Sequence, residues 1–198
     1  MDFFHLLLAK RLKLTVNKAK SAVARPNVRK FLGFSFTGGK EPRRRIAPQA
    51  LARFRSRVRE LTRRIRGASL GQIVKQLAVY LRGWRGYFGF CQTPSVLRDL
   101  DQWLRRRLRA IVWKQWRRGS TRFVELRRRG VGRELATTTA GSHHGPWRLS
   151  NSPALALALP NPFLTSLGLP YLATFMPSNP PNRRIRTRTY GGVGGEGP

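Results

Sequence analysis

The fold is decided by one stretch, PQALARFRSRVRELTRRI at residues 48–65. Its apolar side chains recur at spacings of three and four residues, the period that lines one face of an α-helix. They are Leu51, Phe54, Val58, Leu61 and Ile65. Pro48 suits the first turn of a helix, and half of the other residues are arginines. The stretch therefore predicts an amphipathic helix with one face in a core and the other strongly basic.

Two more helices are predicted downstream. One begins at Ser69, whose hydroxyl can cap the helix while Gln72 reciprocates, and we expect it to end around Gly83 and Gly86. The other starts at Ser95 and runs to about Trp116. With the first helix they form a small three-helix bundle.

Two aspartates, Asp99 and Asp101, precede the arginine-rich part of the third helix. We expect them to lie near its positive end, where negative charge is favourable. Because they are spaced i,i+2 on a helix, they point to different sides and are poorly placed to share a pair of metal ions.

The regions around the bundle are less regular. Residues 30–46 predict a β-hairpin, with an aromatic strand followed by a Gly38-Gly39 turn. A short helix and an extended piece are expected before residue 24, and short helices and loops over residues 118–176. We therefore expect a mainly α protein: a small β-hairpin, a three-helix thumb-like bundle and an irregular basic C-terminal segment.

Charge points to a polyanionic partner. Forty Lys and Arg residues against eight Asp and Glu residues give a net charge of +32 in 198 residues. So many positive charges repel one another unless a polyanion such as nucleic acid compensates them. Arginine dominates, and its guanidinium binds phosphate bidentately and stacks on bases, which favours structured RNA. A generic DNA-binding protein or a ribosomal-type protein fits the composition equally well.

Other classes of protein fit poorly. The single Cys91 excludes a disulfide framework within the chain and a multi-cysteine zinc site, and we expect it to be a small core residue. The apolar stretch at residues 3–9 is too short to span a bilayer and lacks a basic region before it. We expect a cytoplasmic protein with no membrane partner.

Five motifs stand in a fixed order along the chain. They are LKLTVNKAKS at 12–21, FLGFSF at 31–36, YLRGW at 80–84, LDQWLRRRLR at 100–109 and GPWRLS at 145–150. The first two resemble the last palm-domain motifs of the reverse transcriptases encoded by group II introns. The next two are similar to the thumb or maturase-specific domain of that family, and the last to its C-terminal segment.

The resemblance implies four parts. Residues 1–46 would be the incomplete end of a reverse-transcriptase palm, and 47–118 the thumb or maturase-specific domain. Residues 119–176 would be a maturase-associated segment, and 177–198 a disordered basic and Gly-rich tail. The implied function is an RNA-binding maturase that helps a group II intron RNA fold and splice. Structured intron RNA is the implied partner, and a DNA target is a second one; the oligomeric state stays open.

Catalysis in that family belongs to an upstream palm, whose Tyr-x-Asp-Asp strand holds metal ions for polymerisation. The aspartates of this chain are Asp2, Asp99 and Asp101, and none stands in such a motif. We therefore expect no catalytic residues, no metal site and no cofactor, with Mg²⁺ needed only if a separate palm is supplied. His143-His144 lacks the spaced partners of a metal site. Two alternatives stay open: the C-terminal part of a reverse transcriptase that needs a separate palm, and an inactive truncated remnant.

Basic side chains of the bundle are the candidate RNA-binding residues. On the first and third helices they would form two ridges that flank an RNA groove, with phosphate contacts providing affinity. The candidates are Arg53, Arg57, Arg63, Arg64, Arg82, Arg85, Arg105, Arg106, Arg107, Arg109 and Lys114. The alternative is that they form only the solvated faces of amphipathic helices. For the aromatic residues we favour core packing over base stacking. These are Trp84, Tyr87, Phe88, Trp103, Trp113 and Trp116.

Overall fold

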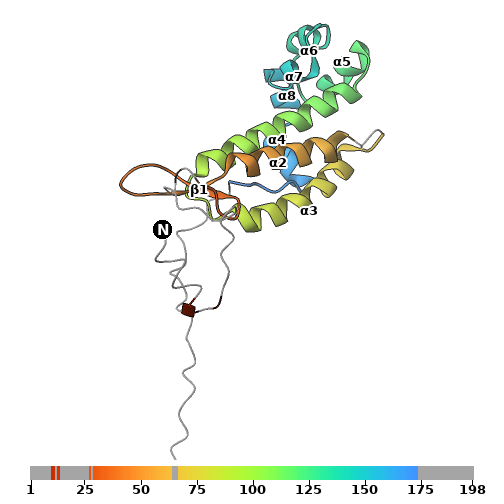
Figure 1. The fold of residues 1–198 in the computed structure, drawn as a ribbon. Coiled ribbons are helices and arrows are strands. Elements are labelled where there is room, and N and C mark those ends of the chain that lie inside the picture. Colours follow the sequence, from red (N-terminus) through yellow and green to blue (C-terminus); the bar gives the residue numbers. More distant parts are fainter. Residues whose placement is uncertain (1–9, 12, 14–26, 28, 64–66, 174–198) are drawn as a thin grey trace, which may run out of the picture.

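The computed structural model describes residues 10–11, 13, 27, 29–63 and 67–173. Over these residues the protein is mainly helical, with one small antiparallel hairpin on its N-terminal side, as predicted (Figure 1). The helix and extended piece expected before residue 24 lie almost wholly outside the described residues. The tail expected at 177–198 lies outside them altogether.

The hairpin consists of β1 (Phe34–Phe36) and β2 (Arg44–Ile46), paired so that Phe34 lies opposite Ile46. Gly33, which precedes β1, has a φ of +79°, and a Cβ there would lie 3.1 Å from Cζ of Phe88. Glycine, which has no Cβ, therefore tolerates both the left-handed backbone and the close approach of the Phe88 ring at this position. The hairpin packs directly on the helical bundle, since the rings of Phe34 and Phe88 are 5.2 Å apart.

Three long helices follow: α2 (Pro48–Arg63), α3 (Leu70–Phe88) and α4 (Pro94–Gln115). The capping box of Ser69 and Gln72 is formed as predicted. The predicted end of the second helix is wrong, because α3 continues through both Gly83 and Gly86. Each glycine costs a helix interior about 1 kcal/mol, and burial of Trp84 and Phe88 in the core offsets that cost.

The first core lies among these three helices. Phe54 and Val58 of α2 pack with apolar residues of α3 and of the first four turns of α4. The rings of Phe54 and Trp84 lie 4.5 Å apart at its centre. The α3 and α4 residues in it include Ile73, Val74, Leu77, Leu81, Leu97, Leu100, Leu104 and Leu108. Of the predicted apolar face, Phe54 and Val58 are thus buried in this core, Leu51 and Leu61 are half-buried against it, and Ile65 lies outside the described residues. Cys91 is half-buried and packs against its edge.

A second core forms around the C-terminal end of α4, where Trp113 and Trp116 are buried. It collects short helices that Figure 1 shows grouped at that end of α4. They are α5 (Gly119–Arg128), α6 (Arg133–Ala140), α7 (Pro146–Leu149) and α8 (Pro153–Ala158). The chain then returns through α9 (Asn161–Ser166) to the first core, to which it adds Leu164, Leu169 and Leu172. Both cores are therefore built on the same helix, α4.

No helix within the described ranges is long and apolar enough to cross a bilayer.

Candidate nucleic-acid interface

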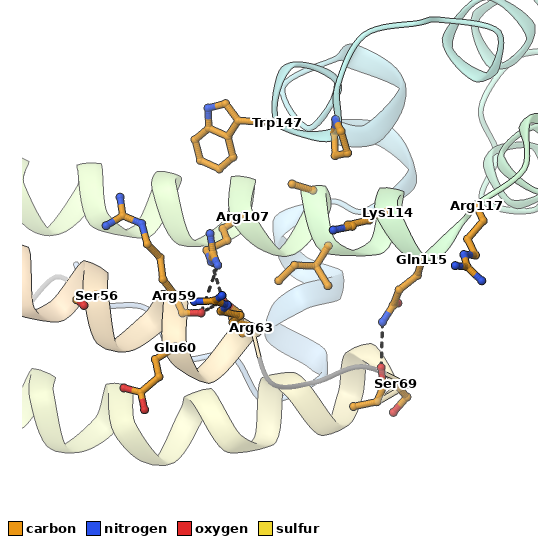
Figure 2. Close-up of a pocket in the computed structure, with 16 residues that line it drawn as sticks. Ser56, Arg59, Glu60, Arg63, Ser69, Arg107, Lys114, Gln115, Arg117 and Trp147 are labelled. Carbon is orange, nitrogen blue, oxygen red and sulfur yellow. Dashed lines mark hydrogen bonds between the residues drawn. The ribbon is translucent and has the colours of Figure 1, made fainter.

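A large open groove runs between α2 and α4 and is bounded by residues 67–69 and α7 (Figure 2). Its volume is ≈ 1750 Å³. One acidic side chain, Glu60, lines it. The basic side chains that line it, here called the groove cations, are Arg59, Arg63, Arg107, Lys114 and Arg117. A groove with this excess of positive charge is suited to a phosphate backbone.

Arg107 joins the two helices that form the groove. Its Nε donates a hydrogen bond to Oγ1 of Thr62 at 2.7 Å, and its Nη2 donates to the carbonyl of Arg59 at 3.4 Å. Burial, and then repulsion from the nearby Arg59 guanidinium, lower the pKa of Arg107. The negative charge of a nearby phosphate would offset this repulsion.

The open end of the groove holds Lys114 and Arg117, which are both exposed. Here the amide Nε2 of Gln115 donates to the carbonyl of Ala68 at 3.0 Å and ties the end of α4 to the segment before α3. The backbone around Lys114 is therefore fixed, while its ammonium group stays in water.

The arginines at positions 105, 106, 107 and 109 of α4, here called the clamp arginines, do not form one ridge. Each makes contacts with a different part of the protein. Arg107 contacts α2, whereas Arg109 donates to the carbonyl of Leu159 at 3.0 Å and to Oδ1 of Asn161 at 2.9 Å. Burial, followed by repulsion from Arg105, lowers the pKa of Arg109. Successive residues on a helix point about 100° apart, so a run of arginines reaches several neighbours.

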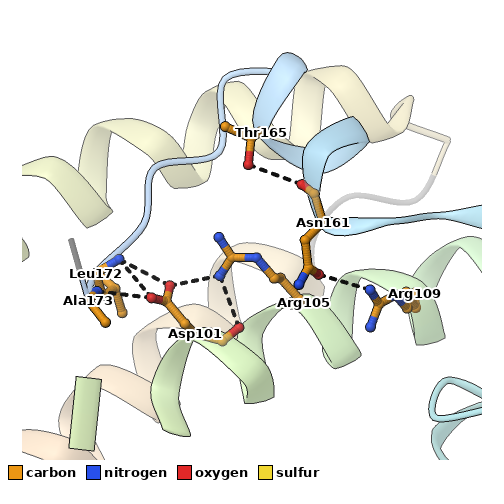
Figure 3. A network of polar contacts seen from close by, with 7 residues as sticks. All are labelled: Asp101, Arg105, Arg109, Asn161, Thr165, Leu172 and Ala173. Carbon is orange, nitrogen blue, oxygen red and sulfur yellow. Dashed lines mark hydrogen bonds and ion pairs between the residues drawn. The ribbon is translucent and has the colours of Figure 1, made fainter. Parts of the chain in front are cut away.

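Arg105 is the most buried of them. Its guanidinium pairs with Asp101 at 2.8 Å, and the two side chains are only 3% and 8% exposed. Asp101 also accepts hydrogen bonds from the backbone N–H groups of Leu172 and Ala173 (Figure 3). The Arg105 guanidinium lies 4.0 Å from the ring centroid of Tyr171. The pair thus fastens residues 171–173 onto α4.

The expectation that Asp99 and Asp101 act as charges near the start of the third helix is wrong. The helix begins at Pro94, and its first turn contains no acidic residue. Asp99 is exposed further along, and Asp101 forms the buried ion pair. The sequence around Asp99 and Asp101 does not show which of the two is buried. The backbone N–H groups that bind Asp101 belong to Leu172 and Ala173, about seventy residues away.

The remaining predicted residues lie in several places. Arg63 and Lys114 line the groove with Arg107. Arg53 and Arg82 are exposed outside the groove lining, and Arg85 is half-buried. Arg57 is exposed and paired with Glu60 at 2.8 Å, and Arg64 lies outside the described residues. Arg59 and Arg117 were missed, although Arg59 stands one turn before Arg63 and the i,i+4 spacing could have revealed it.

The aromatic residues mostly pack in the cores. Trp84, Phe88, Trp113 and Trp116 are buried and Trp103 is half-buried, so the preference for core packing is confirmed for these residues. Tyr87 is more exposed and donates its hydroxyl to the carbonyl of Leu32 at 2.8 Å. Sequence reasoning assigned no role to Trp147, which lines the groove.

No metal centre is formed by the described residues, which include no group of three or more His, Cys, Asp or Glu able to hold an ion. His143 and His144 are both exposed.

Comparison with known families is consistent with this geometry. Residues 51–130 match the family model described as group II intron, maturase-specific domain. The match includes most of α2, all of α3 and α4, and α5, so it contains all five groove cations. It confirms the resemblance of this region to the maturase-specific domain of that family and gives the region a group II intron maturase-related role. A search of curated proteins finds no match.

Proposed function

We propose that this chain binds structured group II intron RNA in the groove between α2 and α4 and thereby helps the RNA fold and splice. The observation that carries the proposal is the position of the groove: all five groove cations lie within the maturase-specific match. Phosphate contacts of this kind provide affinity and salt dependence but little sequence information. Selectivity would come from the folded shape of the RNA.

Hydrogen bonds within the protein hold part of the groove in place before RNA binds. Arg107 is held by Thr62, and the end of α4 is tied to Ala68. RNA that enters the groove would meet two cations of α4, Arg107 and Lys114, whose backbone positions are already set. Binding therefore requires little ordering of the protein, and less of the interaction free energy is lost.

Competition binding at rising salt tests the proposal. The intron RNA that flanks the gene competes with a scrambled RNA of equal length. A preference for the intron RNA that persists above ~0.2 M salt supports recognition of shape, because simple phosphate binding weakens by orders of magnitude there. Equal binding of both RNAs, lost together as salt rises, contradicts the proposal and favours an inactive remnant.

A second function is favoured by one observation, the attachment of the hairpin to the bundle. The carbonyl of Leu32 accepts the Tyr87 hydroxyl, and the carbonyl of Arg44 accepts the backbone N–H of Gln92 at 2.8 Å. Phe31 and Leu32 nevertheless remain 74% and 67% exposed. These side chains could receive a separate palm, which would supply the carboxylates for Mg²⁺ and reverse transcription.

The second function is tested by co-expression with the product of the reading frame immediately upstream. If that frame encodes Tyr-x-Asp-Asp and the two products co-purify with RNA-directed DNA synthesis, the chain is part of a split enzyme. No co-purification, or an upstream frame without the motif, rejects this function.

A further inference from the structure

Trp147 lies at the edge of the groove. It is 43% exposed, whereas the other four tryptophans are buried or half-buried. A single exposed aromatic residue is ordinary on a protein surface, so exposure alone assigns it no role. Its surroundings are different from those of Phe90, which is 58% exposed but lines neither this groove nor the smaller hollow beside it.

The indole is held in a fixed position. The Arg106 guanidinium of α4 lies 4.3 Å from the ring centroid. The same guanidinium donates from Nη2 to the carbonyl of Trp147 at 3.0 Å and from Nε to Oγ of Ser150 at 3.4 Å. Ser150 is buried and its hydroxyl donates to the Trp147 carbonyl at 2.6 Å. The clamp arginine Arg106 thus anchors the ring to the helix that carries two of the groove cations, Arg107 and Lys114.

Trp147 also borders a second, smaller hollow of ≈ 560 Å³. Its lining includes charged side chains, among them Arg98, Asp99 and Arg109, and also amide side chains, whose donors and acceptors suit the edges of nucleotide bases. The amide side chains are Gln102, Asn151 and Asn161. The ring therefore borders both the groove and this hollow, and Figure 2 shows it at the edge of the groove.

We propose that Trp147 is a stacking site for an unpaired base of the RNA bound in the groove. The proposal rests on the proposed function and specifies the RNA further. In paired RNA the faces of the bases are covered by their neighbours, so an indole can stack only on a base in a loop, bulge or single strand. A ring that is already fixed loses little conformational freedom when it stacks.

Two short RNAs test the proposal: a single strand of about 12 nucleotides containing 2-aminopurine, and a fully paired, blunt-ended duplex matched to it in number of phosphates. We expect Trp147→Leu to bind the single strand about 5-fold more weakly or worse and the duplex as the wild type does. Trp147→Phe, which keeps an aromatic face, should lose less. Phe90→Leu is the matched control and should change neither affinity.

Salt dependence distinguishes stacking from loss of charge. The slope of log K against log salt should be the same for Trp147→Leu and the wild type, because no phosphate contact is removed. Circular dichroism and thermal melting show whether the variants fold; if Trp147→Leu unfolds, the comparison of Trp147→Phe with the wild type decides. Equal weakening for both RNAs, or none for either, overturns the proposal.

The outcome is separable from that of the proposed function. If the wild type prefers intron RNA but Trp147→Leu binds both short RNAs normally, the stacking site is rejected and the maturase proposal stands. If the wild type shows no preference for intron RNA while Trp147→Leu still loses affinity for the single strand, the stacking site stands and the proposed intron partner is rejected.

Discussion

The clamp arginines and the groove cations carry the same charge but differ in their surroundings. Arg105 is paired with a buried carboxylate, and Arg106 and Arg109 donate to backbone carbonyls of other elements. Lys114 and Arg117 extend into an open groove. Arg107 belongs to both groups, since it lines the groove and bonds to Thr62. The difference shows that the local surroundings of a basic residue, and not the density of a basic run, decide whether it stabilises the fold or is available to a ligand.

The comparison is tested most strongly at Arg105. Replacement by alanine should lower the free energy of unfolding by about 3–5 kcal/mol, because Asp101 is left buried without its ion-pair partner. Denaturant unfolding followed by circular dichroism measures the loss. The exposed Arg53 provides the control, where alanine should change stability by no more than about 0.5 kcal/mol. An Arg105→Ala protein as stable as the control would show that Arg105 is not a clamp.

A smaller effect, on two properties at once, is expected at Arg107. Replacement by glutamine removes a half-buried hydrogen bond to Thr62 and should cost about 1 kcal/mol of stability. The same change should lower RNA affinity and reduce its salt dependence, because a groove cation is lost. Unfolding and binding are measured on one preparation. If only the stability changed, Arg107 would be a clamp arginine alone; if only the RNA affinity changed, it would be a groove cation alone.

The smallest effect on stability is expected for the double variant Arg63→Gln, Lys114→Gln. Both side chains are exposed in the groove, so the free energy of unfolding should stay within about 0.5 kcal/mol of the wild type. Affinity for intron RNA should fall on the order of tenfold near 0.15 M salt, and the magnitude of the slope of log K against log salt should fall by about 1.4–1.8 because two phosphate contacts are lost.

The matched control for that variant is Arg53→Gln, Arg82→Gln, which removes the same charge from outside the groove. Electrophoretic mobility shift or fluorescence anisotropy at several salt concentrations compares the two variants. Equal losses of affinity would mean that net charge, rather than the groove, binds RNA.

Much of the fold could be predicted because it depends on local patterns. The three-and-four spacing of α2 identified Phe54 and Val58 as core residues, and the capping box fixed the start of α3. The end of α3 could not be predicted, since burial of Phe88 against the hairpin outweighs the local preference of Gly86.

The site was predicted less completely, for a physical reason. Arg105, Arg106 and Arg107 are adjacent in sequence, yet their contacts depend on segments more than forty residues away, apart from the local pair with Asp101. Trp147 stands in a region without a clear helical period, so its place beside the groove became visible only once α7 was seen to pack on α4.

Because both cores share α4, this helix sets the spacing of two of the groove cations. Arg107 and Lys114 are seven residues apart on this one continuous helix, which places them on the same face and about 10.5 Å apart along its axis. No loop lies between them to absorb a mismatch. Because each end of α4 is buried in a different core, the distance between these two backbone positions is constant. Under the proposed function, the helix would favour RNAs whose phosphates match this interval before any base is read.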